Sequence, residues 1–435
     1  MSNQVDSVKG TFQTIEGTSD LLSGARRPLV RIEVWRHVEN VIHSVMHRHG
    51  FAEIRTPVLE PTGLVARGLG QLTDVVSKEM FTFERGDTSY VLRPELTAPI
   101  MRAYLQHHME QKPGVQRLYY IGPCFRAERP QKGRYRQFHQ FGAEIVGTND
   151  PRADAEVIAV MMDVYRTLEL TDTQLRINTL GDAETRPRYR EVLVKYLTPH
   201  TEALTEISRE RLSRNPLRIL DTKVEAERIL LEEAPRLLDY IDEDSRGSYE
   251  ALKGLLQSLE ISFVEDPMLV RGLDYYTQTA FELEHAGIGA QRALAGGGRY
   301  DLLAPAIGSS QPVPAVGFAA GMERLILAME ASELSLPDEH PFDVWMVALG
   351  ETAGREAFLL SQTLRAAGLR VGMDLGYRSM KAQMRLANRA CARQVVIVAD
   401  RELEAEVATV KDMNTGEQLT IPLARLADNL IKTLN

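Results

Sequence analysis

The sequence predicts an α+β protein, in which an antiparallel sheet with packed helices is interrupted by a helical insertion and followed by a separate α/β unit. Residues 1–330 mix amphipathic helical segments with strand-like ones, and the stretch Asp182–Arg246 within them contains no glycine. Beyond residue 342, strands and helices alternate. The 435 residues also suggest more than one core, since single hydrophobic cores stop growing at about 250–300 residues.

The first unit opens with a predicted helix over residues 31–49. Its apolar residues recur at every third or fourth position: Ile32, Trp35, Val38, Ile42, Val45 and Met46. Gly50 then ends the helix. A second helix is predicted over residues 154–168, because Pro151 suits a helix start and valines again share one face. Each apolar stripe needs a sheet to pack on.

Candidate strands lie at residues 90–92, 117–121 and 138–146, separated by loops that contain Pro94, Pro113 and Gly133. This order favours an antiparallel sheet. Residues 181–258 are rich in Glu, Arg and Leu, and they predict a helical insertion with, for example, a helix over 224–241. Strand-like alternation resumes at Ile261.

A linker is predicted at residues 331–341, where two prolines flank an acidic turn. Residues 342–435 then form the separate unit. Its expected strands are 344–348, 369–375 and 395–399, and its expected helices are 354–367 and 379–390. Such alternation favours an α/β unit with a partly parallel sheet.

Composition excludes several classes of protein. The net charge of −9 argues against general affinity for polyanions, and two cysteines cannot build a disulfide framework. No apolar run approaches the roughly 20 residues of a membrane span, and the N-terminus lacks a secretory signal, so we expect a cytoplasmic protein without membrane contact. A local exception to the acidic balance lies at residues 126–136, where five cations face one acid, Glu128.

Residues 124–147 predict two strands joined by this basic loop. Arg126, Gln140 and Glu144 would share one face of the hairpin. Arginine can hold a phosphate through two parallel hydrogen bonds. The alternative is a solvated charged hairpin, but unpaired polar groups in a sheet core cost about 1–3 kcal/mol, which favours a functional reason for Gln140 and Glu144.

Three further blocks combine charge with glycine or proline. LRPELT contains Glu95 and Thr97 after a strand, although Arg93 and Glu95 alone could be a structural ion pair. The second block joins LVRGLDYY, which contains Arg271, with GGGRYD at residues 296–301, which allows close approach of a ligand to the backbone. Finally, Arg324 begins a helix after a glycine-bearing strand, where it can meet an anionic group.

Together and in their order along the chain, the four blocks resemble those of class II aminoacyl-tRNA synthetases, and LVRGLDYY with GGGRYD resembles the histidyl-tRNA synthetase family in particular. The resemblance extends over nearly all of the chain. It implies an antiparallel catalytic sheet of six or seven strands, a helical insertion and an α/β anticodon-binding domain. It also implies a homodimer, in which residues 31–60, including Pro57, form much of the contact.

The resemblance implies a reaction in two steps: histidine and ATP, which carries Mg²⁺, form histidyl-adenylate, and the histidyl group then passes to tRNA(His). It assigns Arg126, Arg271 and Arg324 to the catalytic phosphate contacts and Glu128 to ATP binding. The histidine-binding residues would be Glu95, Thr97, Gln140, Glu144, Tyr275, Tyr276 and Tyr300. The contacts with the acceptor end of the tRNA would be Arg129, Gln131, Arg134 and Arg136. Leu96 departs from the family pattern, which often has glycine there.

Within that assignment, Glu144 and Tyr276 would address the two imidazole nitrogens, while Glu95, Thr97 and Gln140 would hold the α-amino group. Two other classes stay open. One is a noncatalytic, synthetase-like regulatory subunit of ATP phosphoribosyltransferase, which the presence of Arg271, Arg324 and residues 342–435 disfavours. The other is a tRNA-binding or stress-sensing module, for which no additional domain is visible. His43 and His47 fit an interface helix better than a metal site, His139 is expected to be a packed histidine, and the sequence leaves metal ligands and anticodon contacts unassigned.

Overall fold

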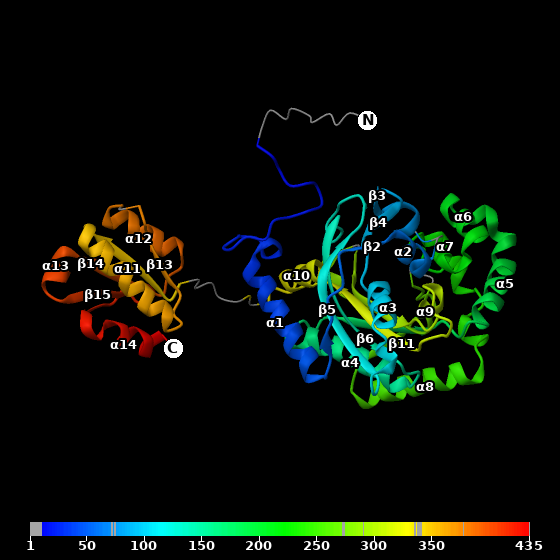
Figure 1. The fold of residues 1–435 in the computed structure, drawn as a ribbon. Helices are drawn as coiled ribbons and strands as arrows, with labels where there is room; N and C mark the ends of the chain where they lie inside the picture. Colours follow the sequence, from blue (N-terminus) through cyan, green and yellow to red (C-terminus); the bar gives the residue numbers. More distant parts are fainter. Residues whose placement is uncertain are drawn as a thin grey trace. The chain divides into compact units, whose positions relative to one another are not determined.

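The computed structural model describes residues 11–434 except 71, 72, 74, 272–274, 290, 335, 337–341 and 377. The chain divides into two compact units, Met1–Ser335 and Leu336–Asn435, and each is described by itself. Figure 1 shows the helices and strands of both units.

The first unit is built on an eight-stranded sheet. Its strand order is β1 (Ala52–Glu53), β5 (Gln116–Phe125), β6 (Gln137–Val146), β11 (Ala315–Gly321), β10 (Ala293–Arg299), β9 (Thr277–Glu284), β7 (Gln174–Thr179) and β8 (Phe263–Glu265). The inner neighbours are antiparallel, whereas the edge pairs β1–β5 and β7–β8 are parallel. The antiparallel sheet is confirmed, with one or two strands more than the resemblance implied because a short strand pairs at each edge.

Helices cover this sheet. Helix α4 (Pro151–Thr167) packs on β6 and β11, and it contacts α1 (Ile32–Arg48) and α8 (Glu243–Ser258). Asp150 caps α4 by accepting a hydrogen bond from the backbone N–H of Arg152, and Pro151 occupies the first turn. Helix α10 (Met322–Ala331) follows β11 directly and also contacts β6.

A small sheet of β2 (Leu59–Pro61), β4 (Thr88–Leu92) and β3 (Phe81–Arg85) precedes the long β5–β6 hairpin. Near it lie α2 (Thr62–Leu69), α3 (Thr97–Gln106) and α9 (Leu303–Ala306), which contact one another. The short helical turns of this unit are Pro28–Val30, Val75–Glu79, Met109–Gln111, Thr198–Ala203, Pro216–Ile219, Leu237–Asp239 and Ala286–Ile288.

The insertion consists of helices with an apolar core of their own, around Tyr189, Leu193 and Leu231. Its first helices are α5 (Thr185–Leu197), α6 (Glu206–Arg214) and α7 (Glu225–Glu232). The single helix predicted over 224–241 is wrong: α7 ends at Glu232 and only a short turn follows. Pro235 explains the break, because proline has no N–H for a helical hydrogen bond.

The second unit has a five-stranded sheet in the order β13 (Val371–Met373), β12 (Val344–Leu349), β14 (Gln394–Ala399), β15 (Val407–Asp412) and β16 (Gln418–Pro422). The first three strands are parallel and the last two antiparallel. One apolar core includes side chains of α11 (Glu351–Ala366), α13 (Asp400–Glu404) and α14 (Leu423–Leu434), whereas α12 (Met380–Arg389) belongs to a second, smaller cluster. Within the described residues of both units, every helix is too short or too polar to cross a membrane.

Candidate active site

A polar pocket of about 240 Å³ lies in the first unit. Side chains from four parts of the chain line it: Glu95 and Thr97 before and in α3, the β5–β6 hairpin, the residues Arg271, Tyr275 and Tyr276 ahead of β9, and the strands β9–β11 with the start of α10. Many of its lining residues are ones that the sequence predicted: Glu95, Thr97, Arg126, Glu128, Arg134, Gln140, Arg271, Tyr275, Tyr276 and Arg324.

Arg126 stands one residue beyond the end of β5. Its Nε donates to the carbonyl of Pro94 at 3.1 Å, and its guanidinium lies 5.1 Å above the Phe138 ring. Glu128 is the nearest acid, 3.9 Å from Nη1, but it lies closer to Arg134 at 3.1 Å. The Arg126 charge is therefore fixed in place by a backbone oxygen and an aromatic ring, with a weak ionic partner.

Arg324 lies in the first turn of α10, where its Nε donates to the Gly133 carbonyl at 3.0 Å and its Nη1 to the Ala293 carbonyl at 2.9 Å. Within the described residues it forms no ion pair. Burial lowers the pKa of Arg324, and the positive charges of Arg134 and Arg126 lower it further. Because Arg126 has only a distant carboxylate partner and Arg324 has none among the described residues, these two cations make the pocket attractive to an anion.

Arg271 forms an ion pair with Glu282 of β9 at 2.7 Å, and its guanidinium carbon lies 5.6 Å from the centre of the Tyr276 ring. Burial lowers the pKa of Arg271, but the Glu282 carboxylate and the neighbouring Tyr276 and Tyr275 together outweigh this effect, and the net shift is upward. In the described part of the protein, the buried Nε of Arg271 has no hydrogen-bond partner. A Cβ at position 296 would lie 2.1 Å from Nη2, so Gly296 makes room for this arginine.

Glu144 lies on β6 and is completely buried. It accepts hydrogen bonds from the Tyr300 hydroxyl at 2.6 Å, from Thr97 Oγ1 at 3.0 Å and from the Tyr120 hydroxyl at 3.5 Å. Burial raises the pKa of Glu144 to about 8, although the three hydroxyl groups oppose the shift. Gly317, opposite on β11, is required here because a Cβ would lie 1.5 Å from Glu144 Oε2.

The remaining predicted histidine-binding residues surround Glu144 or face the pocket. The ring of Tyr275 lies 4.6 Å from that of Tyr276 and 5.7 Å from that of Tyr300. Glu95 accepts hydrogen bonds from the backbone N–H groups of Thr97 and Ala98, at 2.7 and 3.0 Å, at the start of α3. Glu144 and Tyr300 do not line the open pocket. Glu144 lies behind Thr97, to which it is hydrogen-bonded, and Tyr300 lies behind Tyr275, against which its ring packs.

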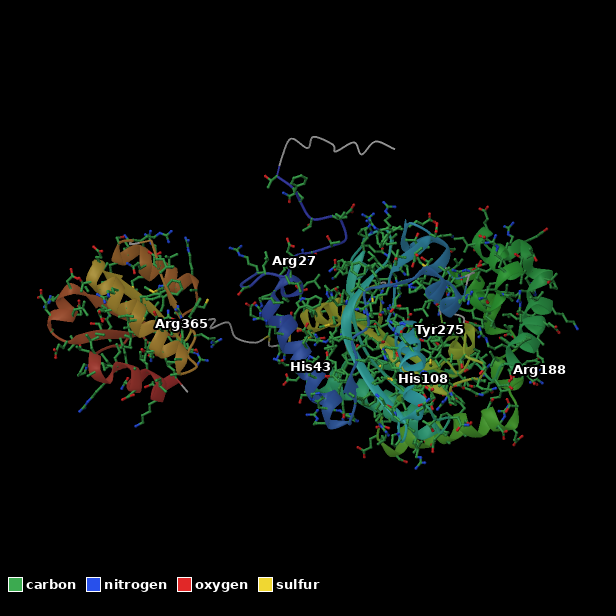
Figure 2. The ribbon with its side chains drawn as sticks, viewed as in Figure 1. Arg27, His43, His108, Arg188, Tyr275 and Arg365 are labelled. Carbon is green, nitrogen blue, oxygen red and sulfur yellow. The ribbon has the colours of Figure 1, made fainter. Side chains whose placement is uncertain are left out.

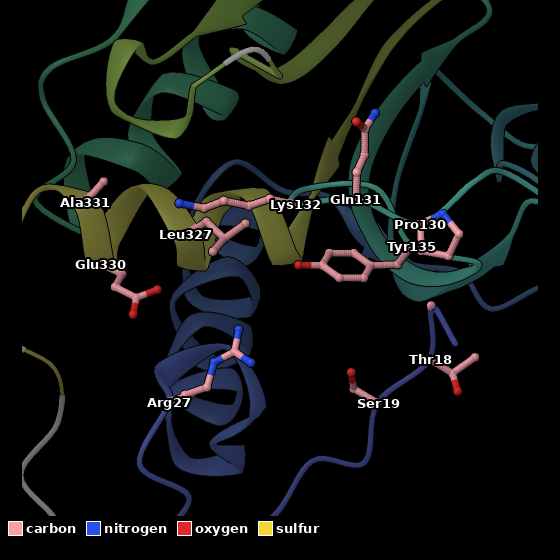
Figure 3. A pocket seen from close by; sticks show the side chains of 11 residues that line it. Thr18, Ser19, Arg27, Pro130, Gln131, Lys132, Tyr135, Leu327, Glu330 and Ala331 are labelled. Carbon is pink, nitrogen blue, oxygen red and sulfur yellow. The ribbon is translucent and has the colours of Figure 1, made fainter. Parts of the chain in front are cut away.

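The residues predicted to contact tRNA lie on the loop between β5 and β6. Arg129, Gln131 and Arg134 are exposed. Arg136 is half-buried, and it donates from Nη1 to the Glu16 carbonyl at 3.2 Å. A second pocket of about 630 Å³ borders the same loop, with Arg27, Gln131 and Lys132 in its wall. Figure 3 shows the side chains of Lys132 and Tyr135 extending from the loop along helix α10.

The histidines lie outside the pocket. His139 bonds to Glu323 at 3.1 Å and packs edge-on against Trp35, whereas His43 of α1 bonds to the Tyr119 hydroxyl at 2.8 Å. Figure 2 shows His43 well separated from Tyr275 at the pocket. Across the described ranges, no three His, Cys, Asp or Glu side chains are grouped to hold a metal ion.

Two acids at the pocket were missed by sequence reasoning. Glu282 holds Arg271, and Glu323 accepts the backbone N–H of His139 with both oxygens at 3.0 Å. For Glu282, the available signal was a charged residue between the fully buried Phe281 and Leu283 of one strand. The signal for Glu323 was an acid beside Arg324 at the start of a helix.

An antiparallel sheet with a helical insertion, arginines from three segments around one pocket and a following α/β unit define a class II aminoacyl-tRNA synthetase. Comparison with known proteins then gives the family. A family model described as histidyl-tRNA synthetase matches residues 30–325, and one described as anticodon binding domain matches residues 343–433. The chain belongs to the histidyl-tRNA synthetase family.

Individual proteins agree with this family. A histidine–tRNA ligase of Geobacillus sp. (strain WCH70) is 45% identical over 428 residues, which cover 98% of this chain and 100% of the relative. The apo structure of S. aureus histidyl-tRNA synthetase superposes with a TM-score of 0.81 at 37% identity, covering 97% of this chain and 100% of that one. A Bacillus halodurans structure described as an ATP phosphoribosyltransferase regulatory subunit/histidyl-tRNA synthetase has a TM-score of 0.63 at 23% identity, which shows the shared fold alone; it covers 90% of this chain and 99% of that one.

Proposed function

We propose that this protein is a histidine–tRNA ligase: it joins histidine to AMP, releasing pyrophosphate, and passes the histidyl group to the 3′ end of tRNA(His). The observation that carries the proposal is the convergence of Arg126, Arg271 and Arg324 on one pocket, next to the polar groups around Glu144. The family of the chain supports the same reaction.

In the first step, a carboxylate oxygen of histidine attacks the α-phosphorus of ATP, and the bond to the bridging oxygen of pyrophosphate breaks. Such chemistry depends on positioning and on stabilising the developing negative charge. We propose that Arg126 and Arg271 hold the α-phosphate and that Arg324 holds the γ-phosphate, with Glu128 also in contact with ATP. The poorly paired guanidinium groups of Arg126 and Arg324 favour these roles.

Mg²⁺ enters this proposal as part of the ATP substrate. It prefers oxygen ligands and usually binds through phosphates and one or two carboxylates. Glu128 and Glu282 are carboxylates in the pocket wall, and each is paired with an arginine. Their oxygens are the kind of ligand that Mg²⁺ takes, so they fit an ion whose other ligands are phosphate oxygens. When bound, the ion would supply positive charge to the departing pyrophosphate.

Neutral imidazole offers one N–H donor and one bare nitrogen acceptor. We propose that Glu144 accepts the N–H and that Tyr276 addresses the other nitrogen, with Tyr275 and Tyr300 beside the ring. Glu95, Thr97 and Gln140 would hold the α-amino group. A site with both complements can reject analogues that lack one of them by about 10⁴-fold.

For tRNA, we propose two contact surfaces, one on each unit. On the first unit, Arg129, Gln131, Arg134 and Arg136 would contact the acceptor end. On the second, helix α12 would contact phosphates near the anticodon: residues 375–399 hold five cations and no acid, and Lys381, Arg385 and Arg389 are exposed at intervals of four residues. Lys and Arg bind phosphates without regard to base identity.

We further propose that the protein acts as a homodimer through residues 31–60. A groove of about 510 Å³ supports this, since Ile54, Pro57 and Pro61 are in its wall and Leu59 on the adjoining strand is 46% exposed. Because charging of tRNA supplies protein synthesis, we expect the enzyme in the cytoplasm.

Histidine-dependent exchange of labelled pyrophosphate into ATP tests the proposed function. Purified protein should exchange label with histidine and not with the other amino acids, and it should then charge tRNA(His). A folded protein without exchange would instead support the regulatory-subunit alternative, and RNA binding without exchange would support the tRNA-binding module.

A further inference from the structure

Arg93 is a buried arginine that forms no ion pair with any acid in the described part of the chain. It follows β4 directly and is 4% exposed. Its Nε donates to the Pro123 carbonyl at 2.9 Å, and its Nη1 donates to the carbonyls of Thr56 and Pro57 at 2.6 and 3.2 Å and to Thr56 Oγ1 at 3.0 Å. Among the described residues, no carboxylate pairs with this guanidinium. Burial of a charge whose hydrogen-bond partners are all neutral oxygens carries a large desolvation penalty. We therefore expect Arg93 to have a role in the site.

The contacts of Arg93 join three segments that are distant in sequence. Thr56 and Pro57 lie between β1 and β2, and Pro123 lies near the end of β5. Backbone hydrogen bonds reinforce the junction, because Arg93 N–H donates to Val58 and the Arg93 carbonyl accepts from Phe125. The turn that starts at Arg93 is thereby fixed from two sides.

The turn that starts at Arg93 contributes three consecutive contacts of the candidate site. The next residue, Pro94, offers the carbonyl that holds Arg126 Nε at 3.1 Å. Glu95 follows, and its carboxylate accepts the N–H groups that begin α3. Thr97 then donates to Glu144 at 3.0 Å. A displacement of Arg93 would therefore reach both the phosphate-binding and the histidine-binding side of the pocket.

Gly122 shows how closely the guanidinium packs against β5. A Cβ at this position would lie 2.5 Å from Arg93 Nη2. Lysine cannot replace these contacts, because its three N–H donors radiate from one nitrogen, whereas the guanidinium donates from two separate nitrogens, Nε toward Pro123 and Nη1 toward Thr56 and Pro57.

We propose that Arg93 is a positioning residue: by fixing the Thr56–Pro57 turn to β5, it sets the Pro94 carbonyl that orients Arg126 and the Glu95–Thr97 turn that orients histidine. This inference rests on the proposed function, since it assigns Arg126 to ATP and Glu95 to histidine. Arg93 itself touches neither substrate.

The test compares Arg93→Lys with Arg117→Lys in steady-state pyrophosphate exchange. Arg117 lies on the same strand as Pro123 but pairs with Glu156, at 2.9 Å, away from the pocket lining. For Arg93→Lys we expect kcat to fall about 30-fold and the KM for histidine to rise at least about fivefold, because small misplacements of catalytic groups cost up to about 100-fold. Arg117→Lys should stay within about twofold of the wild type in both.

A purely structural role would lower the folded fraction, and with it kcat, but would leave the KM for histidine and the KM for ATP unchanged. That result would overturn the proposal. Thr56→Val, which removes one acceptor and keeps the shape, should shift the KM for histidine in the same direction by about twofold and add nothing when combined with Arg93→Lys. Additive effects would also contradict the proposal. If the wild type shows no exchange, the proposed function has failed and not this inference alone.

Discussion

The hydroxyl of Tyr300 donates a 2.6 Å hydrogen bond to Glu144, so the buried carboxyl group behind the pocket wall, on β6, is held by the residue that directly follows β10. Thr97 holds the other oxygen. Because these donors fix both oxygens, the carboxyl group has a defined orientation, and such preorganisation favours the imidazole contact that we propose for it.

Replacement of Glu144 by glutamine should mainly damage recognition of histidine. The amide would keep the size of the side chain but lose the charge that an imidazole N–H favours. We expect the KM for histidine in pyrophosphate exchange to rise at least about tenfold and selectivity over ring-nitrogen analogues to fall, with a smaller change in the KM for ATP. Glu110→Gln, at an exposed acid, is the matched control. An unchanged KM for histidine would show that Glu144 does not contact the imidazole ring.

The pH dependence of histidine affinity follows from the raised pKa of Glu144, about 8. The ionised carboxylate is the stronger acceptor of the imidazole N–H, so the fraction of protein that binds histidine tightly grows as pH rises through this value, while free imidazole, with a pKa near 6.5, is already mostly neutral at pH 7. The KM for histidine should fall up to about tenfold between pH 7 and pH 9, in proportion to the ionised fraction. Glu144→Gln should flatten this profile. A KM that rises over this interval would contradict the assignment.

Arg271→Ala should reduce activation far more than histidine binding. Its side chain faces the reacting phosphate in the proposal, and loss of one such donor typically costs about 10²–10³ in kcat. Equilibrium binding of histidine, measured by calorimetry without ATP, should change by less than about threefold. Since the substitution leaves Glu282 without its partner, the double variant Arg271→Ala/Glu282→Gln serves as a control for that acid. Equal losses in binding and in kcat would refute the phosphate role.

Gly317→Ala tests whether strand packing makes room for Glu144. The added methyl group would meet Glu144 Oε2 at 1.5 Å and the Ala143 carbonyl at 2.7 Å, and such overpacking costs about 1–3 kcal/mol. We expect a lower midpoint of thermal unfolding and weaker histidine binding. Gly254→Ala in α8 has open space, so it should be neutral or slightly stabilising. Wild-type stability and affinity in Gly317→Ala would disprove the close contact.

Loss of the α12 charges separates tRNA binding from activation. We expect a triple variant to raise the KM for tRNA(His) about tenfold or more; it combines Lys381→Gln, Arg385→Gln and Arg389→Gln. The salt dependence of tRNA binding should also weaken, because fewer counterions are released from the RNA. Pyrophosphate exchange, which needs no tRNA, should be unaffected. Neutralising Arg401, Lys411 and Arg425 elsewhere in the same unit provides a control of equal charge. Equal effects of both triple variants would argue against a specific role for α12.

Much of the fold and many residues that line the candidate site could be predicted from the sequence because their signals are local. The apolar face that includes Trp35 and Val38 predicted the first helix, and the alternation of strand and helix patterns after residue 342 predicted the second unit. Pro235 was also a local signal, and the helix predicted across it was wrong. Arg126, Arg271 and Arg324 were found through motifs, and the pocket brings them together.

Features that depend on pairing between distant strands could not be predicted in this way. The need for glycine at 317 follows from its register opposite Glu144 across β6 and β11. The partnership of Arg271 with Glu282 depends on how the segment before β9 folds back on that strand. Arg93 could be taken for one half of an ion pair with Glu95, but the structure gives its hydrogen bonds to carbonyl oxygens of two other segments and to the Thr56 hydroxyl.

A crystal structure with a nonhydrolysable histidyl-adenylate analogue tests the central claim most directly. We predict that the imidazole ring lies about 3 Å from Glu144 and Tyr276, at hydrogen-bond distance, and that the group in place of the α-phosphate contacts Arg126 and Arg271. An analogue bound elsewhere, or bound with its ring away from Glu144, would contradict the account.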